Sequence, residues 1–419
     1  MLHLPANNLY GNESISLEIP DNWEVSVYEY AGADAPAMTY QEICRAISAP
    51  EGCKPIAEAA RGKKDAVIVF DDISRPTPCG DIAKAVVAEL EQAGVPRDKI
   101  RFMCAVGSHR AMSREDYVRK LGEEIVQEFR IYSHNPFFNN TLVGHTSAGV
   151  PIELNADVVA ADFKIAIGNA VPHGNTGIAG GPKTILPGIA SLDSIKALHR
   201  VGVTGRWDLS VPGRDMACQA AELLGLDMKI DVLLNGRGEI AVLYAGNVNA
   251  LATEHEQELR DFYRTPHEMD ADIVLANNYF KPAEPFLSIG YNGIPFSVKK
   301  GGVLIVSSHS PQGAIPHYGQ GTWGDTDVNG PLYSHMPTPR RCKTYYAFST
   351  YMDKGSAAGY HLSGENFKWA DKWDQIVQDV GPDRKKLVIY PYASVGFYGV
   401  NGNIEKGLPT QKTTEELQK

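Results

Sequence analysis

The chain has 419 residues, 43% of them hydrophobic and 21% charged, and a formal net charge of −10. This length suggests two or three domains, and the composition is that of a soluble globular protein with enough apolar side chains for real cores. The acidic balance argues against nucleic acid as a partner, since phosphate binding needs a basic face, and no apolar stretch is long enough to cross a bilayer.

The N-terminus and the cysteines indicate the compartment. Residues 1–5 have neither the charged leader nor the apolar core of a signal peptide. The six cysteines are scattered along the chain without CxxC spacing. We therefore expect reduced thiols in a cytoplasmic protein, and neither a disulfide framework nor a zinc site.

The first half of the chain predicts a β-α-β unit and a further strand. Residues 66–70 form a continuous apolar run, as expected of a strand that is covered on both faces. A helix with one apolar face follows and ends near Gly94. Residues 100–106 are the next predicted strand, so the two strands should pair in parallel. A third buried strand is predicted at residues 163–167.

Polar residues follow each of these predicted strands. Asp72 and Arg75 come after the first strand, His109 after the second and His173 after the third. In open parallel sheets, ligands bind beyond the carboxyl ends of the strands. We therefore expect these four side chains to converge on one edge of one sheet.

The most informative segment is residues 171–183, which read VPHGNTGIAGGPK. It places His173 and Lys183 ten residues apart in a glycine-rich stretch, and glycine lets the backbone approach a ligand closely. The apolar run at residues 184–190 would hold the stem of Lys183 in one place, and His199 follows sixteen residues after that lysine. The alternative is an ordinary mobile surface loop.

These residue types suggest acid–base chemistry on a small acid. Imidazole titrates near neutral pH, so His109 and His173 suit general acid–base catalysis, and a pair facing one substrate from opposite sides is what a racemase or epimerase needs. Arg75 lies in a turn with two prolines, and its guanidinium can clamp a carboxylate through two parallel hydrogen bonds. The alternatives are structural histidines and a surface ion pair of Arg75 with Asp71 or Asp72.

Several common motifs are missing. No GxGxxG follows a strand, which counts against an ordinary NAD site, and there is no Walker loop or GxSxG elbow. His309, His317 and His335 lack standard metal-ligand spacing, so we do not expect zinc there. His134 lies in a turn-like segment and is predicted to be structural.

The second half of the chain predicts a second domain, which begins near residues 265–266. Strands are expected at residues 272–276, 303–307 and 386–390, and residues 308–339 are expected to form loops that line a cleft. The polar tail, residues 405–419, either folds back on the first domain or frays.

We therefore predict an α/β protein of two domains, residues 1–265 and residues 270–400. Each domain is expected to contain a Rossmann-like, mainly parallel sheet. The active site is expected in the cleft between the two domains, whose closure would exclude water.

Four linked motifs resemble the lactate racemase family, whose enzymes carry the nickel-pincer nucleotide. They are DDISRPTP at residues 71–78, GSHR at residues 107–110, the segment 172–183, and LPGIA at residues 186–190. The resemblance covers the first domain in order and spacing. It implies a cofactor, pyridinium-3,5-bisthiocarboxylic acid mononucleotide nickel, that is attached through a thioamide to the lysine at the matching position, Lys183.

The resemblance also implies how Ni(II) is held. Two pincer sulfurs and one ring carbon would bind the metal, with His199 as the fourth ligand, and this soft donor set in a square-planar field suits Ni(II). Gly180, Gly181 and Asp72 fall among the positions that surround the cofactor.

The roles of the remaining first-domain residues follow from the same resemblance. His109 and His173 match the two catalytic bases, and Asp72 and Arg75 match residues that orient the site and the substrate. One histidine would remove the hydroxyl proton while the C2 hydride moves to the pincer ring, and the second would return the proton after hydride delivery to the other face.

The match is weaker in the second domain. The family pattern GYPLDxNxYQxxK has no counterpart in register, although Lys281 lies nearby in residues 278–290. Trp373 resembles the substrate-side tryptophan of the family. Because residues 308–340 are rich in hydrogen-bonding groups, we expect a substrate larger or more polar than lactate, such as a sugar acid.

The sequence thus predicts a cytoplasmic racemase or epimerase of a 2-hydroxy acid that works by proton-coupled hydride transfer and depends on cofactor-synthesis enzymes. One alternative is an NAD-linked 2-hydroxy acid dehydrogenase. Another is a non-enzymatic, two-lobed binding protein for small organic acids, with Arg75 as the carboxylate clamp. The sequence leaves the oligomeric state open.

Overall fold

The computed structural model describes residues 1–201, 207–248, 254–284, 297–313, 315–316, 336–337, 340–351, 362–363 and 365–399. The chain forms two compact units. One is Asp34–Arg260, and the other combines Met1–Ala33 with the described residues from Asp261 onward. Each unit is built on its own six-stranded sheet.

The sheet of the unit Asp34–Arg260 has the strand order β13-β12-β9-β4-β5-β6. Its first five strands in chain order run parallel, and the last is antiparallel to its neighbour. Every residue of β4, β9 and β12 is buried, as expected of central strands covered on both faces. The strands are β4 (Ala66–Asp71), β5 (Ile100–Ala105), β6 (Arg130–Ser133), β9 (Phe163–Asn169), β12 (Met228–Leu234) and β13 (Ile240–Gly246).

The chain enters this sheet in the middle. From β4 it moves outward through β5 to β6, then returns to place β9 on the other side of β4, and continues to β12. The carboxyl ends of β4 and β9 therefore form a topological switch point. Open α/β sheets bind their ligands at such a point.

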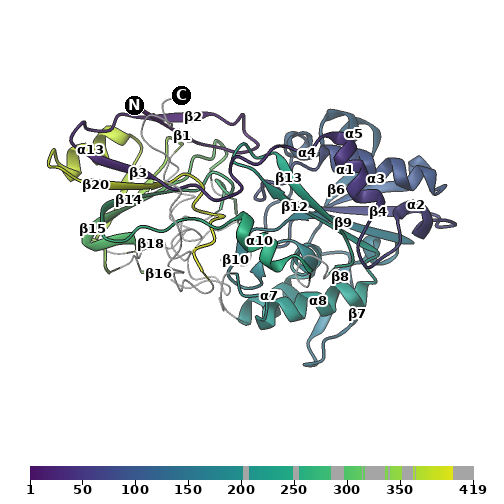
Figure 1. The fold of residues 1–419 in the computed structure, drawn as a ribbon. Helices are drawn as coiled ribbons and strands as arrows, with labels where there is room; N and C mark the ends of the chain where they lie inside the picture. Colours follow the sequence, from purple (N-terminus) through teal and green to yellow (C-terminus); the bar gives the residue numbers. More distant parts are fainter. Residues whose placement is uncertain are drawn as a thin grey trace. The chain divides into compact units, whose positions relative to one another are not determined.

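Helices cover both faces of this sheet. Figure 1 shows α1 to α5 on one side of the sheet and α7 and α8 on the other. The reversal of direction at β4 produces this arrangement, because right-handed crossovers on opposite sides of the switch point place their helices on opposite faces. The helices are α1 (Tyr40–Ser48), α2 (Ile56–Ala59), α3 (Gly80–Gln92), α4 (Arg114–Leu121), α5 (Glu123–Glu128), α7 (Leu192–Arg200) and α8 (Pro212–Leu224).

The second unit contains a fully parallel sheet of order β19-β17-β15-β14-β20-β3. Successive strand residues point to opposite faces, so Val274 and Val388 lie in one apolar cluster while Ile273 and Ile389 lie in another. The strands are β3 (Glu24–Val27), β14 (Ala271–Asn277), β15 (Val298–Ser307), β17 (Thr344–Phe348), β19 (Phe367–Ala370) and β20 (Lys386–Tyr390).

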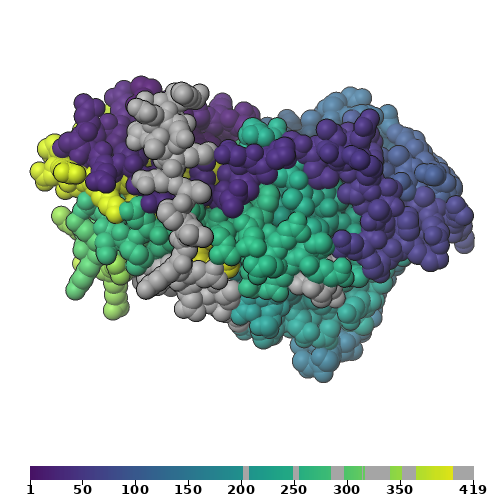
Figure 2. Space-filling view, in the orientation of Figure 1, coloured from purple at the N-terminus to yellow at the C-terminus, as the bar shows by residue number. Residues whose placement is uncertain are grey.

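The N-terminal segment belongs to this second unit, which differs from the predicted first domain of residues 1–265. Strand β3 pairs with β20, and Leu4, Leu17 and Trp23 pack into the apolar cluster on one face of the sheet. Figure 2 shows these purple N-terminal residues directly against the yellow residues of the same unit. The prediction failed because β3 pairs with a strand far away in the sequence. The alternation of apolar and polar residues in a four-residue strand does not indicate which strand it pairs with. The predicted docking of residues 405–419 lies outside the described residues.

The predicted buried strands are all present, and they pair in parallel. The six cysteines are free thiols. Within the parts of the chain that the structure describes, none of the helices combines the length and the apolar character needed to span a bilayer.

Candidate active site

The turn after β4 is buried and is closed by its own side chains. Asp72 Oδ1 accepts hydrogen bonds from the backbone N–H of Ser74 at 3.1 Å and from its hydroxyl at 2.5 Å. The N–H of Arg75 donates to the carbonyl of Asp72, and Arg75 Nη1 donates to Ser74 Oγ at 3.0 Å. This is the local bonding by which Asp shapes a turn. Arg75 is only 8% exposed, so it does not lie on the surface, where the alternative placed it.

A buried lysine of α4 holds the same turn from outside. Lys120 Nζ donates to Asp71 Oδ1 at 2.6 Å and to the carbonyl of Arg75 at 3.0 Å. Thr77 Oγ1 donates to the other oxygen of Asp71. The carboxylate at the end of β4 is therefore a structural anchor for the turn, whereas the carboxylate of its neighbour Asp72 bonds to Ser74 and to His109.

His109 reaches Asp72 from the end of β5. Its Nδ1 lies 2.6 Å from Asp72 Oδ2. Burial raises the pKa of Asp72, but the charge and hydrogen bond of His109, with smaller contributions from Arg75 and Ser74, outweigh burial and hold that pKa below its usual value. The carboxylate is therefore ionised and accepts from Nδ1–H of His109, so Nε2 is the nitrogen of this ring at which a proton can be exchanged.

His173 has the opposite tautomer. It ends β10 (Pro172–His173), which forms a short hairpin with β11 (Gly177–Ile178). Inside the hairpin, the backbone N–H of Asn175 donates to His173 Nδ1 at 3.2 Å. Nδ1 is therefore an acceptor, and the neutral ring carries its proton on Nε2.

The glycine pair before Lys183 packs closely on a carboxylate. The N–H of Gly181 donates to Asp231 Oδ2 at 2.8 Å. Gly180 has a φ of +77°, and a Cβ there would lie 2.5 Å from Asp231 Oδ1 and 2.6 Å from the carbonyl of Asn169. Only glycine fits such a position. The short helix η2 (Gly181–Thr184), which carries Lys183, contacts β4, β9 and β12 near the switch point.

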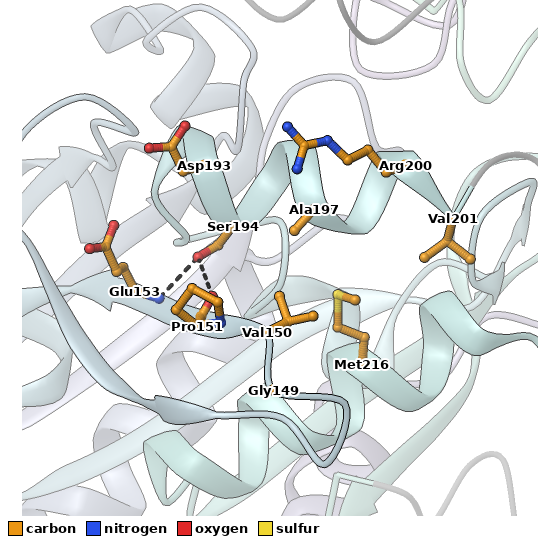
Figure 3. A pocket seen from close by; sticks show the side chains of 10 residues that line it. All are labelled: Gly149, Val150, Pro151, Glu153, Asp193, Ser194, Ala197, Arg200, Val201 and Met216. Atoms are coloured by element: carbon orange, nitrogen blue, oxygen red, sulfur yellow. Dashed lines mark hydrogen bonds between the residues drawn. The ribbon is translucent and has the colours of Figure 1, made fainter.

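Helix α7 carries His199 and is tied firmly to the body of the unit. Ile195 and Leu198 of this helix are buried. Ser194 Oγ accepts from the N–H of Glu153 at 3.0 Å and donates to the carbonyl of Pro151 at 3.4 Å, which fastens α7 to β8 (Pro151–Asn155) (Figure 3).

A pocket with a volume of about 690 Å³ lies beside these bonds. Asp193 and Arg200 of α7 and Met216 of α8 contribute to its lining, whereas His199 does not (Figure 3). This pocket is therefore separate from the predicted site residues.

The ring of His199 is held by one hydrogen bond at Nδ1. Its Nδ1–H donates to the carbonyl of Ile195 at 2.8 Å, which leaves the lone pair on Nε2. Burial lowers the pKa of His199 to about 4, and the charges of Lys183 and His109 act in the same direction, while the bond to Ile195 opposes them. A metal-binding histidine commonly has this second-nitrogen bond to a carbonyl.

The two predicted substrate residues lie in the other unit. Trp373 begins α13 (Trp373–Val380), is 5% exposed in an apolar cluster, and donates its indole N–H to the carbonyl of Glu18. This environment favours a packing role. Lys281 follows β14 and is 3% exposed. Most of the region expected to recognise the substrate, residues 308–340, lies outside the described residues.

The remaining histidine predictions have mixed outcomes. His134 is buried, donates from Nε2 to the carbonyl of Ala190 and accepts from Asn155 at Nδ1, so its predicted structural role is confirmed. His309 is buried beside Thr350. His317 and His335 lie outside the described residues.

Sequence reasoning missed several charged groups around the site. Lys229 and Asp231 form a buried ion pair at 2.6 Å on β12, and Arg214 is buried in the first turn of α8. The available signal was a pair of opposite charges two residues apart in the otherwise apolar strand KIDVLL. Such a pair points to one face of the strand, where each charge needs a partner.

Comparison with known proteins gives consistent matches. Residues 10–209 match the lactate racemase N-terminal domain. The chain is 28% identical to the lactate racemase of Thermoanaerobacterium thermosaccharolyticum over 329 residues, which covers 74% of this chain and 75% of the relative. It is 28% identical to the lactate racemase of Lactiplantibacillus plantarum over 349 residues, which covers 79% and 81%.

Two solved structures share the fold. The lactate racemase apoprotein from T. thermosaccharolyticum superposes with a TM-score of 0.67 at 20% identity, covering 94% of this chain and 99% of that one. A crystal structure of a Thermotoga maritima protein superposes with a TM-score of 0.63 at 16% identity, covering 86% and 98%.

Proposed function

Because the chain belongs to the lactate racemase family, we propose that it racemises or epimerises a 2-hydroxy acid with a nickel-pincer nucleotide attached at Lys183. The observation that carries this proposal is the pair of imidazoles that follow β5 and β9, each held at Nδ1 by a hydrogen bond. Asp72 holds His109 and the N–H of Asn175 holds His173, so Nε2 is the nitrogen of each ring that would exchange a proton with the substrate.

Inversion of a carbinol carbon through a keto acid needs two groups that exchange protons. A neutral imidazole must take the hydroxyl proton as the carbonyl forms, and an imidazolium must supply a proton when the alcohol re-forms from the other face. After one turnover the first ring is the imidazolium and the second is neutral, which is the state required for the reverse direction. The two imidazoles therefore support a reversible reaction without a further acid or base.

Arg75 provides a matching group for the substrate carboxylate. Its guanidinium is buried and held by Ser74, so it loses little conformational entropy when it binds an anion. Asp72 keeps the imidazole of His109 oriented beside it.

The residues present also fit the cofactor. His199 offers a neutral imidazole nitrogen fixed by the carbonyl of Ile195, and Lys183 offers a primary amine on a short, glycine-flanked helix. When bound, the nickel-pincer nucleotide would supply a reversible acceptor for the C2 hydride, with nickel held by sulfur, carbon and imidazole donors. The protein's own part is to orient the substrate and to move the hydroxyl proton.

We further propose that the substrate is larger or more polar than lactate. The support is the sequence of residues 278–290, which lacks the glutamine and lysine pattern of the family. A panel of lactate, malate, phenyllactate and gluconate, assayed on cofactor-loaded protein, identifies the preferred acid by kcat/KM. Preference for lactate would contradict this part of the proposal.

The cofactor assignment is tested by the mass of the protein. Chain co-expressed with the cofactor-synthesis enzymes should carry an adduct that maps to Lys183 and should racemise a 2-hydroxy acid. Lys183→Ala should lose both, whereas Lys196→Ala, which alters a partly exposed lysine of α7, should lose neither. An adduct on another lysine would refute the assignment. Release of a dinucleotide from unmodified protein would instead favour the NAD-linked dehydrogenase.

A further inference from the structure

Three cationic side chains of the unit Asp34–Arg260 are at most 3% exposed. Two of them have carboxylate partners, since Lys120 pairs with Asp71 and Lys229 pairs with Asp231, each at 2.6 Å. The third is Arg214. Among the residues that the structure describes, neither Nη1 nor Nη2 of Arg214 has a hydrogen-bond partner.

An unpaired buried guanidinium calls for an anion. Burial lowers the pKa of Arg214, and the charges of Cys218, Asp231 and Glu256 act in the opposite direction. Arginine nevertheless stays protonated in proteins, so this group does not escape the desolvation cost by losing its proton. A bound anion would remove that cost.

Asp231 does not serve as this anion. Its Oδ1 accepts from Lys229, and its Oδ2 accepts from the N–H of Gly181. Both carboxylate oxygens are thus engaged in bonds that hold the glycine segment in place. The carboxylate and Lys229 together are neutral, so the charge of Arg214 remains unmatched.

Arg214 lies directly against the segment that carries Lys183. A Cβ on Gly181 would lie 3.0 Å from Arg214 Nη2, and Gly181 is two residues before Lys183. Helix α8 packs on η2. The guanidinium therefore reaches the backbone next to the reactive lysine.

A second buried side chain at the same glycines also lacks partners. Asn169, the last residue of β9, is 1% exposed, and neither Nδ2 nor Oδ1 is hydrogen-bonded within the described parts of the chain. Its carbonyl lies 2.6 Å from the position of a Cβ on Gly180. The guanidinium of Arg214 thus lies beside Gly181, and the backbone of Asn169, whose side chain is also unsatisfied, lies beside Gly180. Buried polar groups in native proteins are rarely left in this state, so both indicate a missing ligand.

We propose that Arg214 and Asn169, with the first turn of α8, form a subsite for a phosphate monoester beside Lys183. Arginine binds phosphate through parallel hydrogen bonds, and the amide can donate a further one. Helix α8 has thirteen residues and no side-chain N-cap bond, and its positive end adds to the charge of Arg214, against the single acidic residue of the same turn, Asp215. In the proposed function, this subsite would anchor the phosphate of the mononucleotide cofactor. That assignment of the ligand rests on the proposed function.

Titration of cofactor-free protein tests the subsite. We expect inorganic phosphate and nicotinate mononucleotide to bind and to raise Tm, and nicotinate riboside, which lacks the phosphate, to bind at least about tenfold more weakly than the mononucleotide. In Arg214→Gln, affinity for both phosphate compounds should fall by about 10- to 100-fold, the range for a hydrogen bond to a charged group. Arg200→Gln, which removes an exposed arginine, should bind as the wild type does.

Stability separates a ligand site from a structural arginine. Without phosphate, Arg214→Gln should be at least as stable as the wild type, because it removes an unpaired buried charge. The proposal would be overturned if Arg214→Gln were less stable than the wild type and phosphate did not raise the Tm of the wild type. Equal binding of the mononucleotide and the riboside would overturn it too.

The subsite and the proposed function can fail separately. Lys183→Ala should retain phosphate binding, because the subsite does not use the lysine amine. Loss of phosphate affinity in Arg214→Gln supports the subsite even if no adduct forms at Lys183. An adduct at Lys183 combined with unchanged binding in Arg214→Gln would refute the subsite and leave the function intact.

Discussion

At the scale of single residues, hydrogen bonds to Nδ1 decide what each imidazole can do. Asp72 and the carbonyl of Ile195 accept from the Nδ1–H of His109 and of His199, whereas the N–H of Asn175 donates to Nδ1 of His173. Three histidines of one unit are therefore held in two different ways. The difference lies in their neighbours, since the side chains are chemically identical.

Asp72→Asn should keep the geometry of the turn and lose activity. An amide has an N–H group as well as an oxygen, so it does not hold the ring of His109 in a single tautomer. We expect kcat of cofactor-loaded enzyme to fall by about 10²- to 10⁴-fold, the range for loss of a tautomer-fixing carboxylate or a general base. Asp81→Asn, an exposed change in α3, is the control. Racemisation near the wild-type rate would show that Asp72 does not orient a base.

His134 should make the protein less stable in mild acid. Burial lowers its pKa to about 4, against the opposing effect of its bond to Ala190, while an unfolded histidine titrates near about 6.5. The unfolded chain therefore binds more protons between these values. The neutral ring therefore contributes fully to the free energy of unfolding above about pH 6.5, and this contribution is lost as pH falls through about 4. The contribution is on the order of 3 kcal/mol.

Urea unfolding at several pH values measures this effect. His134→Gln should be less stable at neutral pH and should show a smaller loss of unfolding free energy between about pH 6.5 and 4, by up to about 1.4 kcal/mol per pH unit. His145→Gln changes an exposed histidine and should leave the dependence of the unfolding free energy on pH as it is in the wild type. An unchanged slope in His134→Gln would mean that the ring is protonated in the folded state.

At the scale of elements, the site depends on turns that other elements hold in place. The turn after β4 is anchored by Lys120 of α4, and the glycine pair before Lys183 is anchored by Asp231 of β12. Helix α7 is anchored to β8 by Ser194. Each of these segments is thus held by a polar contact with a different element.

Lys120→Met should be strongly destabilising. It leaves the carboxylate of Asp71 without its cation in a buried position, which costs about 3–5 kcal/mol. Lys84→Met removes a partly exposed ion pair with Glu124 and should cost less than about 1 kcal/mol. Thermal and urea unfolding give both values. Similar losses of unfolding free energy in the two variants would show that the buried ion pair contributes no more to stability than the exposed one.

At the scale of the whole molecule, local sequence pattern was enough to predict the central strands and the edge where the site lies. Residues 66–70 and 163–167 are long apolar runs, and topology rules then brought Asp72, His109 and His173 to one edge. The place of β3 was not predictable, because its four residues carry no signal for a partner near residue 388. Arg214 and Asn169 were missed for a related reason: burial without a partner is visible only in three dimensions.

The pairing of β3 with β20 also bears on how the chain is made. Val27 leaves the ribosome about 360 residues before Ile389, its partner in the sheet. At about 5–20 residues per second, residues 24–27 wait for roughly 20–70 s with an unpaired backbone, while the whole of the unit Asp34–Arg260 is synthesised and can fold. The last sheet to form is thus completed by one of the first strands made, so a nascent chain remains open to mispairing and chaperone capture at its N-terminus until translation is nearly complete.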